Sequence, residues 1–183
     1  HRHHLKKIAD DMADIGGQAI TAAERATALQ QVLSAREGYT GDSDDYDSME
    51  NANLKAVIDR RKGLPVALSI LYLHAGRSLG WPVYGLNFPG HFLIRVPFND
   101  GKMVTTGELR ALAKQLLGND AELVPAFYKP ISDRQMLVRL QNNIRLRALN
   151  QGDIPLAVKI LYRLVLLDPA RAEFWYELGM LEV

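Results

Sequence analysis

A nearly continuous apolar run over residues 63–96 is the feature that most constrains how this chain of 183 residues folds. From Leu64 to Leu79, apolar residues occupy almost every angular position of a helix instead of a single stripe. Pro65 fits the first helical turn, where an amide hydrogen would have no partner, and Gly80 is a stop signal. The sequence therefore predicts a central helix that is buried on most sides.

Two strands are expected directly after this helix. Residues 83–88 and 91–96 are rich in β-branched and aromatic side chains, and Pro89-Gly90 between them is a turn signal. The predicted order in this part of the chain is helix, turn, strand, turn and strand.

Four short groups of residues carry a resemblance to a known family: residues 60–65, 71–73, 77–82 and 87–93. They resemble the transglutaminase-like superfamily, and more closely its bacterial SirB-type branch, in which such a domain precedes tetratricopeptide repeats. The resemblance implies an α+β fold. We expect a transglutaminase-like (papain-like) core with a buried central helix and a small antiparallel sheet, mostly helical overall, followed by tetratricopeptide-type helices.

Active members of this superfamily carry a Cys at the start of the central helix, a His at the head of the next-but-one strand, and an Asp on a neighbouring strand. In this chain Pro65 occupies the Cys position and His91 the His position. Relatives usually carry Asp-Pro-Phe at the third position, where this chain has Val96-Pro97-Phe98. Either the acid is lost, or a loop that carried it is absent between Val96 and Pro97. The resemblance therefore implies a degenerate active site with a vestigial His91.

The complete absence of cysteine supports this interpretation, because it excludes thiolate catalysis, disulfide bonds and cysteine-rich metal sites. Loss of a catalytic nucleophile typically lowers turnover by about a million-fold. An enzyme that uses another residue is the first alternative: Ser69 lies one turn after Pro65 and could face His91. No Gly-x-Ser-x-Gly motif surrounds Ser69, however, and a buried Ser that bonds to a helical carbonyl is far commoner. We therefore predict a pseudoenzyme.

A small-ligand binder is the second alternative, in which the old cleft is kept as a pocket with His91 and a loop amide as polar anchors. Residues 38–53 form the loop, since they contain two glycines and five acids. Gly41, Tyr46 and Asn51 fit the corresponding stretch of SirB-type proteins, so the resemblance places this loop over the former active site. Our candidates for cleft residues are Pro65, Ser69, Tyr46, Asn51 and Asn87.

Two patterns that suggest a metal site have simpler interpretations. An EF-hand loop starting at Asp42 would have Asp47 at its sixth position and Asn53 at its twelfth, instead of the required Gly and Glu. The histidines at positions 1, 3 and 4 lie next to a chain end, where a solvated segment is expected. We therefore expect neither a metal nor a cofactor. The basic residues 60–62 are interpreted as a solvated turn, with an anion contact as the alternative.

The composition is that of an ordinary globular protein, with 48% hydrophobic and 23% charged residues. A net charge of +1 gives no basic excess that would attract nucleic acid or an anionic membrane. No apolar run reaches the about 20 residues that span a bilayer. We therefore predict a cytoplasmic protein that binds neither nucleic acid nor membranes.

Helices that cover the core are predicted on both sides of the central stretch. Apolar residues recur at helical spacing in residues 5–12, 19–36 and 109–117, and Thr21 with Glu24 has the spacing of a capping box. Residues 99–102 form a turn signal before a short strand candidate at 103–105. Two prolines, at 125 and 130, argue against regular structure beyond a turn or two in residues 121–130.

The last part of the chain has the pattern of paired helices. Ser132 and Gln135 have capping-box spacing, and apolar residues then recur at helical spacing in 136–149 and 154–165. A 34-residue tetratricopeptide unit requires a small residue in its second helix, Pro at its close, and Trp-x-x-Leu-Gly in the next unit. These positions are occupied in one register by Ala157, Pro169, Trp175, Leu178 and Gly179.

We accordingly divide the chain into a transglutaminase-like domain (1–120), a linker (121–131) and tetratricopeptide-repeat-like helices (132–183) that stop partway into a repeat. The predicted repeat interface consists of Ala157, Trp175, Leu178 and Gly179. The function we favour is a non-catalytic interaction or regulatory protein, in which the repeats bind a protein or peptide segment.

Overall fold

The computed structural model describes residues 1–86, 88, 92–96, 110–111, 113–115, 118–120, 122 and 124–182. The chain divides into two compact units. The first contains His1–Thr40 and Leu68–Ile131, and the second contains Gly41–Ala67 and Ser132–Val183. Each unit consists of two separate stretches of the sequence, so the second unit combines residues 41–67 with the C-terminal helices.

Two helices open the first unit, α1 (Arg2–Gly16) and α2 (Ala22–Gln30). The predicted capping box is confirmed: the backbone amide of Glu24 donates to Thr21 Oγ1 over 3.2 Å, and the Glu24 carboxylate accepts from the Thr21 amide over 2.9 Å. The single helix predicted over 19–36 is corrected, because the chain continues after α2 as a π-helix, Gln31–Arg36. Its adjacent side chains Val32 and Leu33 are both fully buried.

The central helix α4 (Pro65–Ser78) begins at the predicted proline. Gly80 just beyond it has a φ of 71°, a left-handed conformation that suits glycine and ends the helix. Its buried side chains point in many directions around the helix axis, as expected for a helix covered on most sides: Val66, Ala67, Ser69, Leu71, Leu73 and Ala75. The prediction of a buried central helix is therefore confirmed.

A three-stranded antiparallel sheet follows, in the order β4-β3-β5. Tyr84 of β3 (Tyr84–Leu86) lies opposite Arg95 of β4 (Leu93–Arg95). Strand β3 also lies antiparallel to β5 (Pro130–Ile131). The small antiparallel sheet was predicted, but β5 was not.

The segment before β5 forms one helical turn, α6 (Pro125–Tyr128). Its Phe127 ring packs against Phe88, with 5.4 Å between the ring centroids. Pro130 lacks an amide hydrogen, yet an edge strand needs partners on one side only, so a short strand forms here despite the proline. The turn predicted at 99–102 and the strand at 103–105 lie outside the described residues, as do several residues of the helix predicted at 109–117.

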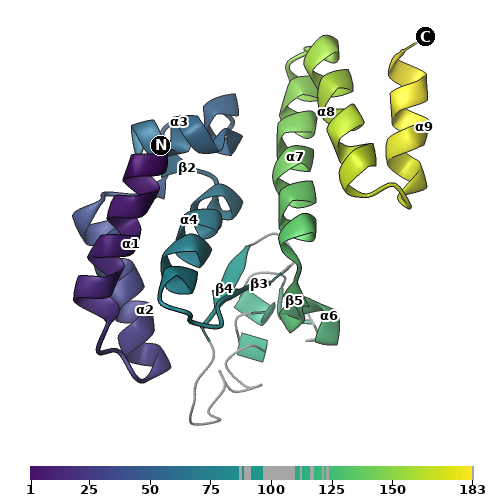
Figure 1. Ribbon diagram of the computed structural model, residues 1–183. Coiled ribbons are helices and arrows are strands. Elements are labelled where there is room, and N and C mark those ends of the chain that lie inside the picture. Colours follow the sequence, from purple (N-terminus) through teal and green to yellow (C-terminus); the bar gives the residue numbers. More distant parts are fainter. Residues whose placement is uncertain are drawn as a thin grey trace. The chain divides into compact units, whose positions relative to one another are not determined.

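Helices α7 (Asp133–Asn150), α8 (Ile154–Leu167) and α9 (Ala172–Leu181) belong to the second unit (Figure 1). The capping box of Ser132 and Gln135 is present as predicted, and Gly152 in the α7–α8 turn has a φ of 73°. The three helices share one apolar core: Val138, Ile160, Leu161, Leu164, Val165, Phe174 and Leu178. The predicted helical hairpin is thus confirmed, with a third helix packed on it.

The rest of the second unit is short and irregular. It contains the 3-10 helix Met49–Ala52 (η2), α3 (Leu54–Arg60) and the two-residue strand β2 (Lys62–Gly63). Another two-residue strand, β1 (Thr40–Gly41), lies where the sequence passes from the first unit into the second. Asn53 caps α3 by accepting a hydrogen bond from the amide of Lys55 over 3.2 Å. Within the described part of the chain, no helix is both long and apolar enough to cross a membrane.

Candidate functional site

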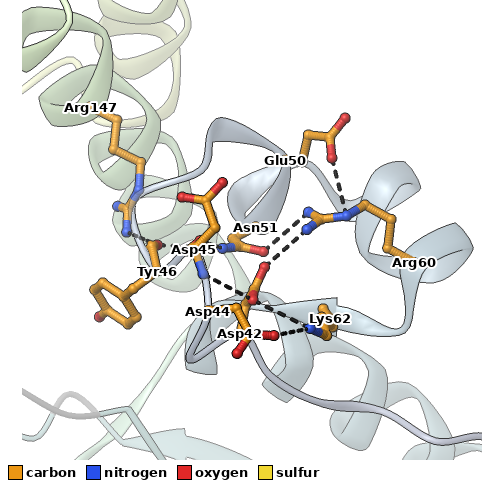
Figure 2. A network of polar contacts seen from close by, with 9 residues as sticks. All are labelled: Asp42, Asp44, Asp45, Tyr46, Glu50, Asn51, Arg60, Lys62 and Arg147. Carbon is orange, nitrogen blue, oxygen red and sulfur yellow. Dashed lines mark hydrogen bonds and ion pairs between the residues drawn. The ribbon is translucent and has the colours of Figure 1, made fainter.

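The acidic loop, residues 41–53, is held by a network of charges around Asp42 (Figure 2). Asp42 is buried, and its Oδ2 accepts a hydrogen bond from Arg60 Nη2 over 2.9 Å. Its Oδ1 accepts from the backbone amide of Asp45 over 3.3 Å and lies 3.7 Å from Lys62 Nζ. Arg60 is the last residue of α3 and Lys62 follows two residues later, so the end of this short helix places both cations beside the loop.

Opposing effects act on the pKa of Asp42. Burial by itself would raise the pKa of this carboxyl, but hydrogen bonds from the Asp45 amide and the Arg60 guanidinium favour the charged form. Asn51 and the positive charge of Lys62 act in the same direction, and together they hold the pKa of Asp42 below its ordinary value. Asp42 is therefore a charged, paired group and not a proton donor near neutral pH.

Asn51 is the fully buried centre of the loop. Its side-chain nitrogen donates to the carbonyl of Asp45 over 2.6 Å, and its side-chain oxygen accepts from Arg60 Nη1 over 3.3 Å. Its backbone carbonyl accepts from the amide of Leu64 over 2.8 Å. Because Leu64 precedes the first residue of α4, Asn51 ties the loop to the start of the central helix.

The basic residues 60–62 are not a solvated turn, so that interpretation is corrected. Lys62 Nζ lies 2.7 Å from Asp44 Oδ2, and Arg60 Nε lies 3.1 Å from Glu50 Oε2. The hydrogen bond to Asp44 is the main cause that raises the pKa of Lys62. The alternative of an anion contact is the correct one, and the anions are the carboxylates of the chain itself.

Arg147 of α7 connects the C-terminal helices to the same loop (Figure 2). Its Nη2 donates to the carbonyl of Tyr46 over 3.1 Å, and its guanidinium carbon lies 5.5 Å from the centroid of the Tyr46 ring. Arg147 is buried, and its Nη1 also donates to Asn143 Oδ1 over 3.3 Å. One side chain of α7 therefore fixes the tip of a loop that lies about 100 residues earlier in the sequence.

This arrangement is suited to holding a loop and not to acid–base chemistry. Asp42, Asp44 and Glu50 each lie beside a cation, so their charges are already neutralised. A general base requires a proton acceptor that is free to reach its substrate. The network is therefore a structural clamp on the loop.

The predicted cleft residues fall in different surroundings. Pro65 is exposed at the first turn of α4, whereas Ser69 on the same helix is only 5% exposed. Tyr46 is 59% exposed, and its carbonyl lies 3.4 Å from the side-chain nitrogen of Asn51. Asn87 and His91 lie outside the described residues, so the pairing of Ser69 with His91 stays a hypothesis.

The four residues of the predicted repeat interface also differ in burial. Ala157 and Leu178 are buried, and Leu178 belongs to the apolar core of α7–α9. Trp175 is 52% exposed, and its indole nitrogen donates to the carbonyl of Pro169 over 2.9 Å. Gly179 is exposed, with open space where a side chain would project.

Sequence reasoning missed Arg147, which was treated only as part of a helix. A signal was present, because Arg147 lies next to Ala148 and three residues after Ile144, on a helix whose apolar spacing was recognised. A charged residue on the edge of such a face needs a polar partner when it is buried. Its partner is a backbone carbonyl in a distant loop, which no local pattern reveals.

Comparison with known proteins identifies a family model and bacterial relatives that match most of the chain. A family model described as the transglutaminase-like superfamily matches residues 1–142. The "UPF0162 protein PA3419" of Pseudomonas aeruginosa is 32% identical over 180 residues, which cover 93% of this chain and 66% of that protein. A "UPF0162 protein" of Xylella fastidiosa is 30% identical over 169 residues, which cover 85% of this chain and 60% of that protein.

A more distant similarity reaches a eukaryotic protein. "F-box only protein 21" of Homo sapiens is 29% identical over 135 residues, which cover 64% of this chain and 20% of that protein. No solved structure matches the chain. The chain spans about three fifths to two thirds of the length of the bacterial relatives described above. The family match covers more than half of the chain and the central helix and sheet lie within it; the chain therefore belongs to the transglutaminase-like superfamily.

Proposed function

We propose that this chain is a non-catalytic interaction or regulatory protein of the SirB-type branch. In this proposal, a transglutaminase-like core without its nucleophile is joined to tetratricopeptide-type helices, α7–α9, that bind a protein or peptide segment.

The observation that carries the proposal is a group of exposed apolar side chains on α8 and α9. Leu166 is 79% exposed, Tyr176 73% and Met180 61%. Single exposed apolar residues are normal on a protein surface, whereas neighbouring ones mark an interaction site, and Tyr176 and Met180 lie one turn apart on α9. The exposed indole of Trp175 belongs to the same pair of helices.

The helix order supports the repeat interpretation. Helices α7 and α8 are joined by a tight turn at Gly152, α8 ends just before Pro169, and α9 follows. Ala157 is fully buried at the position where the repeat pattern requires a small side chain.

Two observations argue against catalysis. The 183 residues contain no cysteine, and Pro65 stands where the resemblance places the nucleophile. The alternative nucleophile, Ser69, is buried in α4, whereas a nucleophile must be reachable by its substrate.

The proposal is tested by selecting binders from a random peptide display library and mapping them by hydrogen exchange. We expect selected peptides to protect amides of α7–α9. A parallel assay for transamidation and peptide hydrolysis should remain at background. The absence of any peptide that protects these helices, or a turnover that His91→Ala abolishes, would show that the proposal is wrong.

A further inference from the structure

One face of α9 is hollowed. The hollow has a volume of about 480 Å³ and is lined by Ala172, Glu173, Tyr176, Glu177 and Met180. These residues recur at helical spacing and so share one side of the helix. Phe174 and Leu178, on the other side, pack into the apolar core.

The apolar part of the hollow consists of Tyr176 and Met180, which lie one turn apart and are largely exposed. Tyrosine provides a rigid ring with a polar end, and methionine adapts its shape to a partner. Both residue types are enriched in protein interfaces relative to the rest of a protein surface. This pair therefore provides a contact area for an apolar side chain.

The charged part of the hollow consists of Glu173 and Glu177, also one turn apart. Like charges at this spacing repel each other along a helix. Arg145 of α7 pairs with one oxygen of Glu177. The other oxygen, Oε1, is buried and has no hydrogen-bond partner among the described residues. Because Oε1 has almost no accessible surface, a donor arriving from outside does not reach it. The exposed carboxylate of the hollow is that of Glu173.

We propose that this hollow binds a protein segment that presents a Lys or Arg side chain beside an apolar side chain. The cation pairs with the exposed carboxylate of Glu173, and the apolar side chain packs on Tyr176 and Met180. The inference rests on the proposed function, because it names the partner chemistry for the same helices.

Charge complementarity selects this occupant over a second copy of the chain. The lining residues include two carboxylates and no cation. A symmetric contact through this face would bring like charges together, which is destabilising. Arg145 already pairs with Glu177, so a basic partner compensates the charge of Glu173.

The test uses three fluorescein-labelled helical peptides that share leucines at positions i, i+3, i+4 and i+7. Their remaining positions carry Lys in the first, Gln in the second and Glu in the third. Fluorescence anisotropy should show that the Lys peptide binds at least about ten-fold more tightly than the Glu peptide, with an affinity that falls as salt is added.

Three variants locate the binding. Glu173→Gln should weaken the Lys peptide about three-fold, as expected for a partly exposed ion pair. Tyr176→Ala should weaken it about ten-fold or more, as expected for an aromatic residue at an interface. The matched control is Ile20→Ala, which removes an exposed apolar side chain outside α7–α9 and should leave the affinity unchanged.

A further readout needs no variant. The methyl signal of Met180 in the NMR spectrum should shift on addition of the Lys peptide. If the Gln and Glu peptides bind as tightly as the Lys peptide, or the Met180 signal does not move, the inference is wrong while the proposed function stands. If display selection also yields no peptide that protects α7–α9, the proposed function is wrong as well.

Discussion

Two parts of the second unit are ordered by opposite means. Helices α7–α9 are held together by an apolar core, in which Ile160, Leu161 and Leu164 are almost completely buried. The acidic loop, which is rich in polar residues, is held by paired charges around Asp42 and by Arg147. The comparison teaches that the same unit responds to mutation in two ways: the helices through packing, and the loop through charge and hydrogen bonding.

The largest expected effect lies in the apolar part. Ala157→Arg places a long charged side chain where the native residue is fully buried, so we expect a loss of several kcal/mol in the free energy of unfolding. Urea denaturation followed by circular dichroism measures it. Ala170→Arg, at an exposed position, is the matched control and should unfold like the parent. Equal stability of Ala157→Arg and the parent would contradict the packing described for α8.

The sequence predicted this helical part because its information is local. Apolar residues at helical spacing, the Ser132 capping box and the Gly152 turn each depend on neighbouring residues, and each is found in the structure. The central helix was predictable for the same reason. Strand β5 was missed because its formation depends on pairing with β3, about 45 residues earlier, and not on its own proline-containing sequence.

The next largest loss of stability is expected when the contact between Arg147 of α7 and the acidic loop is removed. Arg147→Ala leaves the carbonyl of Tyr46 without the donor on α7, and we expect a loss of about 1–3 kcal/mol in the free energy of unfolding. Hydrogen exchange should also become faster in residues 43–50. The matched control is Arg163→Ala on the exposed face of α8, which should change neither measurement. Unchanged exchange in the loop would show that Arg147 does not hold it.

The candidate site was less predictable than the helices. The sequence identified the loop and two of its members, Tyr46 and Asn51, and it gave an anion contact of residues 60–62 as an alternative. It did not identify the carboxylates that these cations pair with, and it missed Arg147. Arg60 pairs with Asp42 across 18 residues, and Arg147 reaches Tyr46 across 101 residues. Such pairings follow from the tertiary fold, because a charged residue can be satisfied by many partners, and the spacing along the chain does not select one.

A smaller effect, with a distinct pH dependence, is expected for Asp42→Asn. Arg60 and the Asp45 amide donate to different oxygens of Asp42, so asparagine keeps an acceptor for only one of them and also loses the charge. Because folding lowers the pKa of Asp42, its charge contributes stability above the unfolded-state pKa of about 3.9, and this contribution is lost as the pH falls towards the folded-state pKa. The parent should therefore be more stable than the variant at pH 7, and the difference should shrink between about pH 5 and pH 3.

Urea denaturation at a series of pH values measures this difference. The control is Asp133→Asn in the first turn of α7, which keeps a side chain of similar size and changes an exposed carboxylate outside the network. A stability difference for Asp42→Asn that stays constant from pH 7 to pH 3 would mean that the charge of Asp42 is not what holds the loop.

The smallest effect is that of Trp175→Ala, and it is compared with the effect of a buried member of the predicted repeat interface, Leu178. Leu178→Ala removes a side chain from the apolar core and should cost about 2–5 kcal/mol in the free energy of unfolding. Trp175→Ala removes a half-exposed ring and one hydrogen bond to the Pro169 carbonyl, so we expect a loss of about 1 kcal/mol. A tryptophan closed inside a repeat interface would instead cost about 3–5 kcal/mol. Equal losses for the two variants in urea denaturation would show that Trp175 is packed as tightly as Leu178, because only a covered ring contributes that much.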